Sequence, residues 1–238
     1  MSDLYLDAAS GVLRNLLGIT DSYELDVAEA ELSRASMMLL HEQGFDDFST
    51  KGIKYIHKSL FGDVYDWAGE FRIINIQKRE PMLAGISVWY SNSEDIERDL
   101  GTAWQSISSI DWSKLSKCEF VKQLVKQFAT LWKIHPFREG NTRTLVMMLT
   151  FFVEHHGYYL DQELLAESAG YVRNAFVMAS MGDYAEPEHL ERILMDAVST
   201  EPIEYADAVD GATPVDDGGR SEYRTSEYKP VPHEYRED

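Results

Sequence analysis

The chain has 238 residues, of which 44% are hydrophobic and 12% aromatic, which is enough apolar material for one well-buried domain. Its formal charge of −19 would repel phosphate backbones and anionic lipid surfaces, so nucleic-acid binding and membrane-surface roles are not expected. A single cysteine, Cys118, excludes an internal disulfide and a four-thiolate metal site.

The first residues give no sign of export. Residues 1–7 are acidic and lack the basic start and apolar stretch of a signal peptide. The longest apolar run, near residues 145–153, is far shorter than the ~20 residues that a membrane-spanning helix needs. We therefore expect a cytoplasmic protein.

Apolar residues at helical spacing predict two helices in the first quarter of the chain. The first covers residues 24–40 and follows a polar stretch that can cap its first turn. The second covers residues 50–61, is capped by Ser49 or Thr50, and ends near Gly62. We assign residues 1–48 to an N-terminal helical part.

Two short segments, residues 71–77 and 86–90, are rich in aromatic and β-branched residues, which is typical of strands. We expect them to form a small β-hairpin over about residues 71–90. Lys78 and Arg79 lie in its connection and are interpreted as solvated loop charges, with a role in holding nucleotide or target as the alternative.

Helical patterns fill the remainder of the region that we assign to the core, residues 49–199. The helix after Ser93 has one apolar stripe, and the next begins within residues 113–116 and ends before His135, because a residue before proline disfavours helical geometry. Further helices are expected at 141 to 155 or 156, at about 161–180, and at about 187–199. The predicted fold class is mainly α with one hairpin.

The composition changes after Thr200. Residues 200–238 are acidic, poor in aliphatic residues, and contain four prolines. Such a segment buries too little apolar surface to fold alone, so we predict a disordered acidic tail.

The densest cluster of chemically useful side chains is the loop at residues 135–143, His-Pro-Phe-Arg-Glu-Gly-Asn-Thr-Arg. A loop that ends at a helix start presents backbone N–H groups, and Gly140 lets the backbone approach a ligand, so the pattern favours an anion site. Asn141 and the Thr142 hydroxyl can add hydrogen bonds. Arg143 adds a planar fork of donors suited to phosphate oxygens.

Two titratable residues complete the loop. Glu139 beside bound phosphates makes sense if Mg²⁺ lies between them, since magnesium is held by one or two carboxylates plus phosphate oxygens. His135, with an ordinary pKa of ~6.5, can take a hydroxyl proton near neutral pH. A transition-metal site at this pair would lack a third ligand at motif spacing.

The loop resembles the signature of the Fic family, His-Pro-Phe-x-Asp/Glu-Gly-Asn-x-Arg-x-x-Arg, as far as Arg143. Residues 15–25 and 61–72 are similar to other stretches of that family, and the resemblance covers roughly residues 12–198. It implies a Fic-fold helical bundle with a β-hairpin flap over the active-site loop. It also implies a bacterial protein adenylyltransferase, an enzyme that transfers AMP from ATP to a Ser, Thr or Tyr hydroxyl of a target protein, with a toxin-like role left open.

The resemblance implies roles by position. His135 would be the general base, Glu139 the Mg²⁺ ligand, and Phe137 a core anchor for the loop. The phosphates of ATP would be bound by Gly140, Asn141, Thr142 and Arg143. The edge of the flap would pair with an extended segment of the protein substrate.

Two positions depart from the family pattern. Val146 stands where a second arginine meets the γ-phosphate, so the chain is expected to orient ATP less well or to choose its nucleotide less strictly. Thr142 replaces a common glycine. The family's inhibitory Ser/Thr-x-x-x-Glu-Gly/Asn helix is not found in the sequence, so an inhibitor would be a separate antitoxin-like partner.

Other functions stay open. A Doc-like protein kinase would bind ATP in reverse and transfer the γ-phosphate, although Doc-like loops usually carry a lysine at the position of Thr142. Another nucleotidyl transfer belongs to the same class of reaction. A catalytically weak peptide-binding module would follow if Val146 marks a degenerate site, and an acidic helical scaffold is the remaining alternative.

Overall fold

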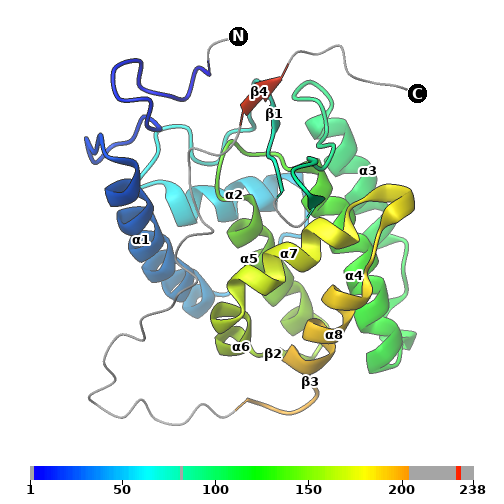
Figure 1. The fold of residues 1–238 in the computed structure, drawn as a ribbon. Helices are drawn as coiled ribbons and strands as arrows, with labels where there is room; N and C mark the ends of the chain where they lie inside the picture. The colour runs from blue at the N-terminus through cyan, green and yellow to red at the C-terminus, as the bar shows by residue number, and fades with distance from the viewer. Residues whose placement is uncertain (1–2, 81–82, 204–228, 232–238) are drawn as a thin grey trace.

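The structure is a computed structural model that describes residues 3–80, 83–203 and 229–231 (Figure 1). The helices of this part are α1 (Ser22–Gln43), α2 (Thr50–Phe61), α3 (Ile96–Ser108), α4 (Lys117–Ile134), α5 (Asn141–His155), α6 (Gln162–Glu167), α7 (Ala169–Ala179) and α8 (Glu188–Ala197). The strands are β1 (Asn75–Gln77), β2 (Tyr159–Leu160), β3 (Val198–Ser199) and β4 (Lys229–Val231). The mainly α class is confirmed.

Side-chain caps explain where the helices begin. The Ser49 side chain accepts hydrogen bonds from the first-turn N–H groups of α2. Ser116 and Glu119 form a reciprocal capping box at the start of α4. Helix α4 ends at Ile134, directly before the His135-Pro136 pair, as the sequence predicts.

The helix expected over residues 161–180 is interrupted. Ser168 has non-helical backbone angles and is both the last cap of α6 and the first cap of α7. Ser168 and the following Gly170 are both weak helix formers, which fits a break at this point. The chain changes direction there, and α7 packs against α4 and α8.

The expected hairpin pairs differently. Only residues 75–77 of the first segment form a strand, and β1 pairs antiparallel with β4 rather than with residues 86–90, which have no regular strand. The returning segment is held instead by a turn in which the Glu80 N–H donates to Ile86 O (3.1 Å). The carboxylate of Glu80 forms a two-pronged ion pair with Arg173 of α7 (2.8 and 2.9 Å), which anchors this segment to the helices.

Most of the predicted tail lies outside the described residues. Of the tail, residues 200–203 and 229–231 are described, and residues 229–231 form β4, which pairs with β1. Figure 1 shows β4 beside β1, on the side of the molecule where the segment between α2 and α3 runs.

The hydrophobic core is centred on α4 and α5. Helix α4 packs against α3, α5, α7 and α8, and α5 also packs against α2. Helix α5 contributes large apolar side chains to this core, among them Met147, Met148, Phe151 and Phe152. The loop between α4 and α5 is therefore fixed at both ends by core helices.

Within the part that the structure describes, no helix is both long and apolar enough to cross a lipid bilayer.

Candidate active site

The loop from His135 to Gly140 is bounded by two left-handed residues. His135 ends α4 with φ 52°, and Gly140 begins α5 with φ 75°. Left-handed backbone is uncommon for a residue with a side chain and persists only where its surroundings impose it. At Gly140 a side chain is excluded outright, because an added Cβ would lie 2.4 Å from the Phe61 ring.

His135 has the protonation state of a general base. Its Nδ1 lies 3.3 Å from Trp132 O and donates to it, which places the basic lone pair on Nε2. Burial, and then the positive charge of Arg72, hold the pKa of His135 well below its ordinary value. The ring is therefore neutral near pH 7 and can accept a proton from a hydroxyl.

The ring of Tyr90 covers His135. The two rings stack at 4.0 Å with an interplanar angle of 17°, and His135 is fully buried. Tyr90 therefore shields one face of the imidazole, and the ring is closed to solvent in this arrangement.

Arg72 ties the catalytic loop to the two ends of the expected flap. Its Nε donates to His135 O (2.9 Å) and its Nη1 to Ile74 O (2.8 Å), while Nη2 donates to Ser91 O. The side chain is buried. The guanidinium of Arg72 thus fixes both ends of segment 74–91 against the backbone of His135.

Glu139 has the properties of a cation ligand. Its Oε1 accepts from the Gly140 N–H (2.9 Å), whereas Oε2 is buried and has no hydrogen-bond partner among the described residues. Burial, followed by the charge of Glu29, raises the pKa of Glu139 to about 7. A buried carboxylate oxygen without a donor is costly unless a cation compensates it, so the residue fits Mg²⁺.

His57 of α2 supports Glu139 from behind. Its Nε2 donates to Glu139 O (3.0 Å), and its Nδ1 accepts from the Gly69 N–H (2.8 Å), so both ring nitrogens are assigned. Its ring stacks on Phe137 at 3.8 Å. Burial lowers the pKa of His57 to about 3, which keeps the ring neutral. Phe137 is fully buried and anchors the loop as predicted.

The side chains of Asn141 and Thr142 shape the loop itself. Asn141 Oδ1 accepts from the Phe137 N–H and its Nδ2 donates to Phe137 O, each at 2.8 Å. Thr142 Oγ1 accepts from Trp132 Nε1 (2.9 Å). These contacts fix the first turn of α5, whose N–H groups have no partners within the helix and can bind an anion.

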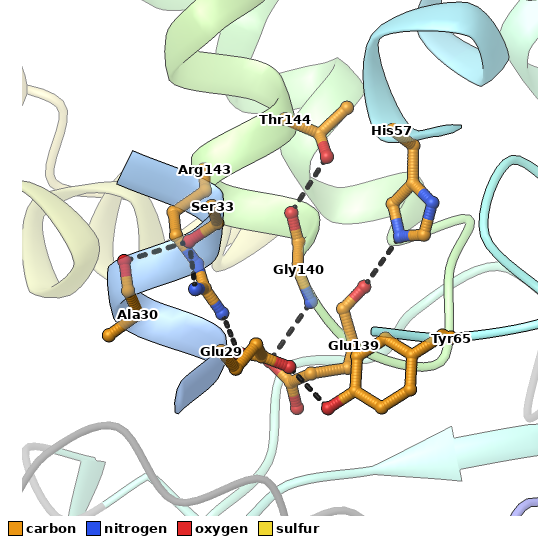
Figure 2. Close-up of polar contacts among 9 residues, drawn as sticks. All are labelled: Glu29, Ala30, Ser33, His57, Tyr65, Glu139, Gly140, Arg143 and Thr144. Carbon is orange, nitrogen blue, oxygen red and sulfur yellow. Dashed lines mark hydrogen bonds and ion pairs between the residues drawn. The ribbon is translucent and has the colours of Figure 1, made fainter. Parts of the chain in front are cut away.

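Arg143 is held by side chains of α1 (Figure 2). Its Nη1 donates to Ser33 Oγ (2.9 Å), and its Nη2 forms an ion pair with Glu29. The Phe61 ring lies beneath the guanidinium, 4.8 Å from Cζ. Glu29 also accepts a hydrogen bond from the Tyr65 hydroxyl, so the contacts that hold Arg143 extend beyond the loop.

A family model described as the Fic/DOC family matches residues 47–153. The chain is also 35% identical over 178 residues to the probable protein adenylyltransferase y4lH of Sinorhizobium fredii, covering 73% of this chain and 86% of that relative. The chain belongs to the Fic/DOC family. The resemblance found in the sequence is thereby confirmed.

Other relatives agree on fold and family. The chain is 33% identical over 161 residues to the protein adenylyltransferase VbhT of Bartonella schoenbuchensis, but it spans only 32% of that relative's length. The solved structure of BepC from Bartonella tribocorum, with bound AMPPNP, matches at a TM-score of 0.71 with 20% identity, over 83% of this chain and 97% of that chain. The Fic domain of Bep8 from Bartonella sp. 1-1C matches equally well, with a TM-score of 0.71 over 83% of this chain and 94% of that chain.

The structure brings the predicted Fic/DOC motif residues together in one loop and one helix turn, from His135 to Arg143. Val146 lies one turn further along α5, partly buried against the core, so a hydrophobic contact replaces the second motif arginine. Lys78 is buried, not solvated as predicted, and its charge acts on both His135 and Glu139.

Several residues of the Fic/DOC site were not predicted from the sequence. Apolar spacing predicted a helix at residues 24–40, but the buried face of α1 combines apolar with polar residues: Leu25, Glu29, Ser33 and Leu40. The exact spacing of four from Leu25 to Glu29 to Ser33 is a signal that could have indicated a polar buried face. Arg72, Tyr90 and His57 had no such signal in one sequence.

Proposed function

We propose that this Fic/DOC chain is a protein adenylyltransferase that uses ATP. Three relatives that this chain matches over most of their length, from Sinorhizobium fredii, Escherichia coli and Salmonella typhimurium, are each named a probable protein adenylyltransferase. A solved relative holds AMPPNP and another holds ADP, which supports an adenine nucleotide as the substrate class. The observation that carries the proposal is the loop itself, with a neutral His135 at one end and Arg143 at the other.

The reaction follows from the positions of these groups. His135 Nε2 accepts the proton of a Ser, Thr or Tyr hydroxyl, and the oxygen attacks the α-phosphorus of ATP. The new bond joins that oxygen to the α-phosphorus, the bond from the α-phosphorus to the bridging oxygen breaks, and pyrophosphate leaves. The first turn of α5 and Arg143 hold the phosphate oxygens. Mg²⁺ bound at Glu139 would neutralise negative charge on the phosphates.

The protein substrate is proposed to dock along β1. In support, β1 already pairs with an extended segment, and the register joins Asn75 to Val231 and Gln77 to Lys229. Pro230 lies opposite Ile76 and has no N–H, so it suits a position that exchanges no hydrogen bond with the neighbouring strand. An extended target segment would add to the same edge by β-augmentation, in competition with β4.

A bacterial origin and a cytoplasmic location are part of this proposal, and the bacterial relatives and the single cysteine support them.

Labelled ATP tests the proposed function. The purified chain is incubated with cell lysate and with ATP labelled at the α- or the γ-phosphate, alongside a His135→Ala variant. We expect transfer of the α label only, with a loss on the order of 10²- to 10⁴-fold in the variant. Transfer of the γ label alone would establish a Doc-like kinase instead, and the absence of any His135-dependent label would favour a peptide-binding module. A chain that ends at Ile203 should label lysate proteins more strongly, since β4 is then removed from the docking edge.

A further inference from the structure

Helix α1 presents a polar pair to the active site from its buried face. Glu29 and Ser33 lie one helical turn apart, and both are buried. Both contact the same guanidinium, that of Arg143, but at different nitrogens. Two contacts at two nitrogens fix the plane of a guanidinium, whereas one contact would leave it free to rotate.

The surroundings of Glu29 indicate that this contact serves the site. The side chain of Glu29 is 3% exposed, whereas that of Arg143 is 22% exposed, so the carboxylate is enclosed more completely than the arginine that it holds. The carboxylate also accepts from Tyr65, the aromatic residue before Trp67 in the segment that leads to the flap. The Phe61 ring supports the face of the guanidinium.

The charges around Arg143 favour a role in orienting the phosphates over a role in attracting them. Arg143 pairs with the carboxylate of Glu29, and the charges of both residues act on Glu139, where the effect of Glu29 is the larger. Glu29 cancels most of the charge of Arg143, and the guanidinium then acts as an aimed pair of donors. Because Val146 has replaced the second motif arginine, the aim of Arg143 matters more in this chain than in relatives with two arginines.

We infer that Glu29, with Ser33, is a positioning residue for nucleotidyl transfer, and that it holds the Arg143 guanidinium in the orientation that meets the phosphates. This inference rests on the proposed function. It assigns to α1, which lies in the region before the matched family model, an effect on the rate of the chemical step that acts through Arg143.

Steady-state kinetics with varied ATP test the inference. In Glu29→Gln, which keeps the shape but removes the charge, kcat should fall about ten- to a hundredfold while KM for ATP stays the same or falls. Ser33→Ala, which removes only one hydroxyl, should lower kcat less but in the same way. Glu31→Gln is the matched control, because Glu31 is exposed on the same helix and should behave as the wild type.

Three outcomes would overturn the inference. The first is a kcat for Glu29→Gln within about twofold of the wild type. The second is an increase in kcat, since Glu29 would then compete with the nucleotide for Arg143. The third is an unchanged order of the Arg143 Nε–H group in Glu29→Gln, measured by NMR relaxation. The inference predicts a more mobile guanidinium in this variant, and the measurement does not require an active enzyme. A wild-type chain that transfers no α label would count against the proposed function alone.

Discussion

The two ends of the catalytic loop are held by different kinds of contact. Around His135 the partners are backbone carbonyls, the Tyr90 ring and the guanidinium of Arg72. Around Arg143 they are a carboxylate and a hydroxyl from α1. The first set keeps an imidazole neutral, and the second set pairs a cation with one buried carboxylate. One short loop can therefore maintain a proton acceptor and an anion cradle without either perturbing the other.

The largest effect on this arrangement is expected at Gly140, the residue that joins the two ends. Gly140→Ala forces a side chain into the Phe61 ring and into a left-handed backbone, so the free energy of unfolding should fall by about 2 to 5 kcal/mol. Gly157→Ala is the control, because Gly157 has φ +80° but no atom within 4 Å of an added Cβ. That variant should lose only about 1 to 2 kcal/mol. Urea unfolding measures both, and equal losses would contradict the packing argument.

A smaller effect is expected from the ionisation of Glu139. Its pKa is raised from 4.5 to about 7 in the folded chain, so the folded state binds more protons than the unfolded state between these values. Stability due to this group is present below the lower value and is lost as the pH rises through about 7, by at most about 1.4 kcal/mol per pH unit.

A divalent cation at Glu139 would offset that loss. Mg²⁺ should therefore raise the melting temperature more above about pH 7 than near pH 5. In Glu139→Gln both the pH dependence and the magnesium effect should shrink, while Glu31→Gln should retain both. A magnesium effect that is the same at both pH values would argue that the cation binds elsewhere.

The smallest effect is expected at Val146. Val146→Arg would restore a second guanidinium one turn beyond Arg143, and kcat/KM for ATP should rise about fivefold. Val146 is partly buried, so the variant should also lose about 1 kcal/mol of stability. Val146→Lys is the matched comparison, since it adds the charge without the planar fork and should give a smaller gain. Unchanged kinetics in both variants would show that the second arginine is dispensable in this chain.

The sequence predicted best those features that depend on neighbouring residues. Ser49 and Ser116 cap helices, Pro136 ends one, and the motif from His135 to Arg143 forms one continuous loop and turn. Each of these depends on contacts within a few residues, which local patterns encode.

Features that depend on distant pairing could not be predicted in the same way. Glu29 meets Arg143 across 114 residues of sequence, and among many acidic residues nothing local distinguishes it. The partner of β1 is β4 from the far end of the chain, since so short a strand has too little pattern to select its neighbour. Lys78 was misread because a charged residue in a connection is usually solvated, whereas here it lies inside the site.

The buried contact behind the loop has a practical consequence for handling the protein. Arg138 is fully buried, and both its Nε and its Nη2 donate to the carboxylate of Asp3, at 3.0 and 2.8 Å. The third residue of the chain is therefore the counter-ion of a residue in the catalytic loop. Where a recombinant version starts, and whether an affinity tag precedes it, thus decides the electrostatic support of the active site and belongs among the controlled variables of any assay.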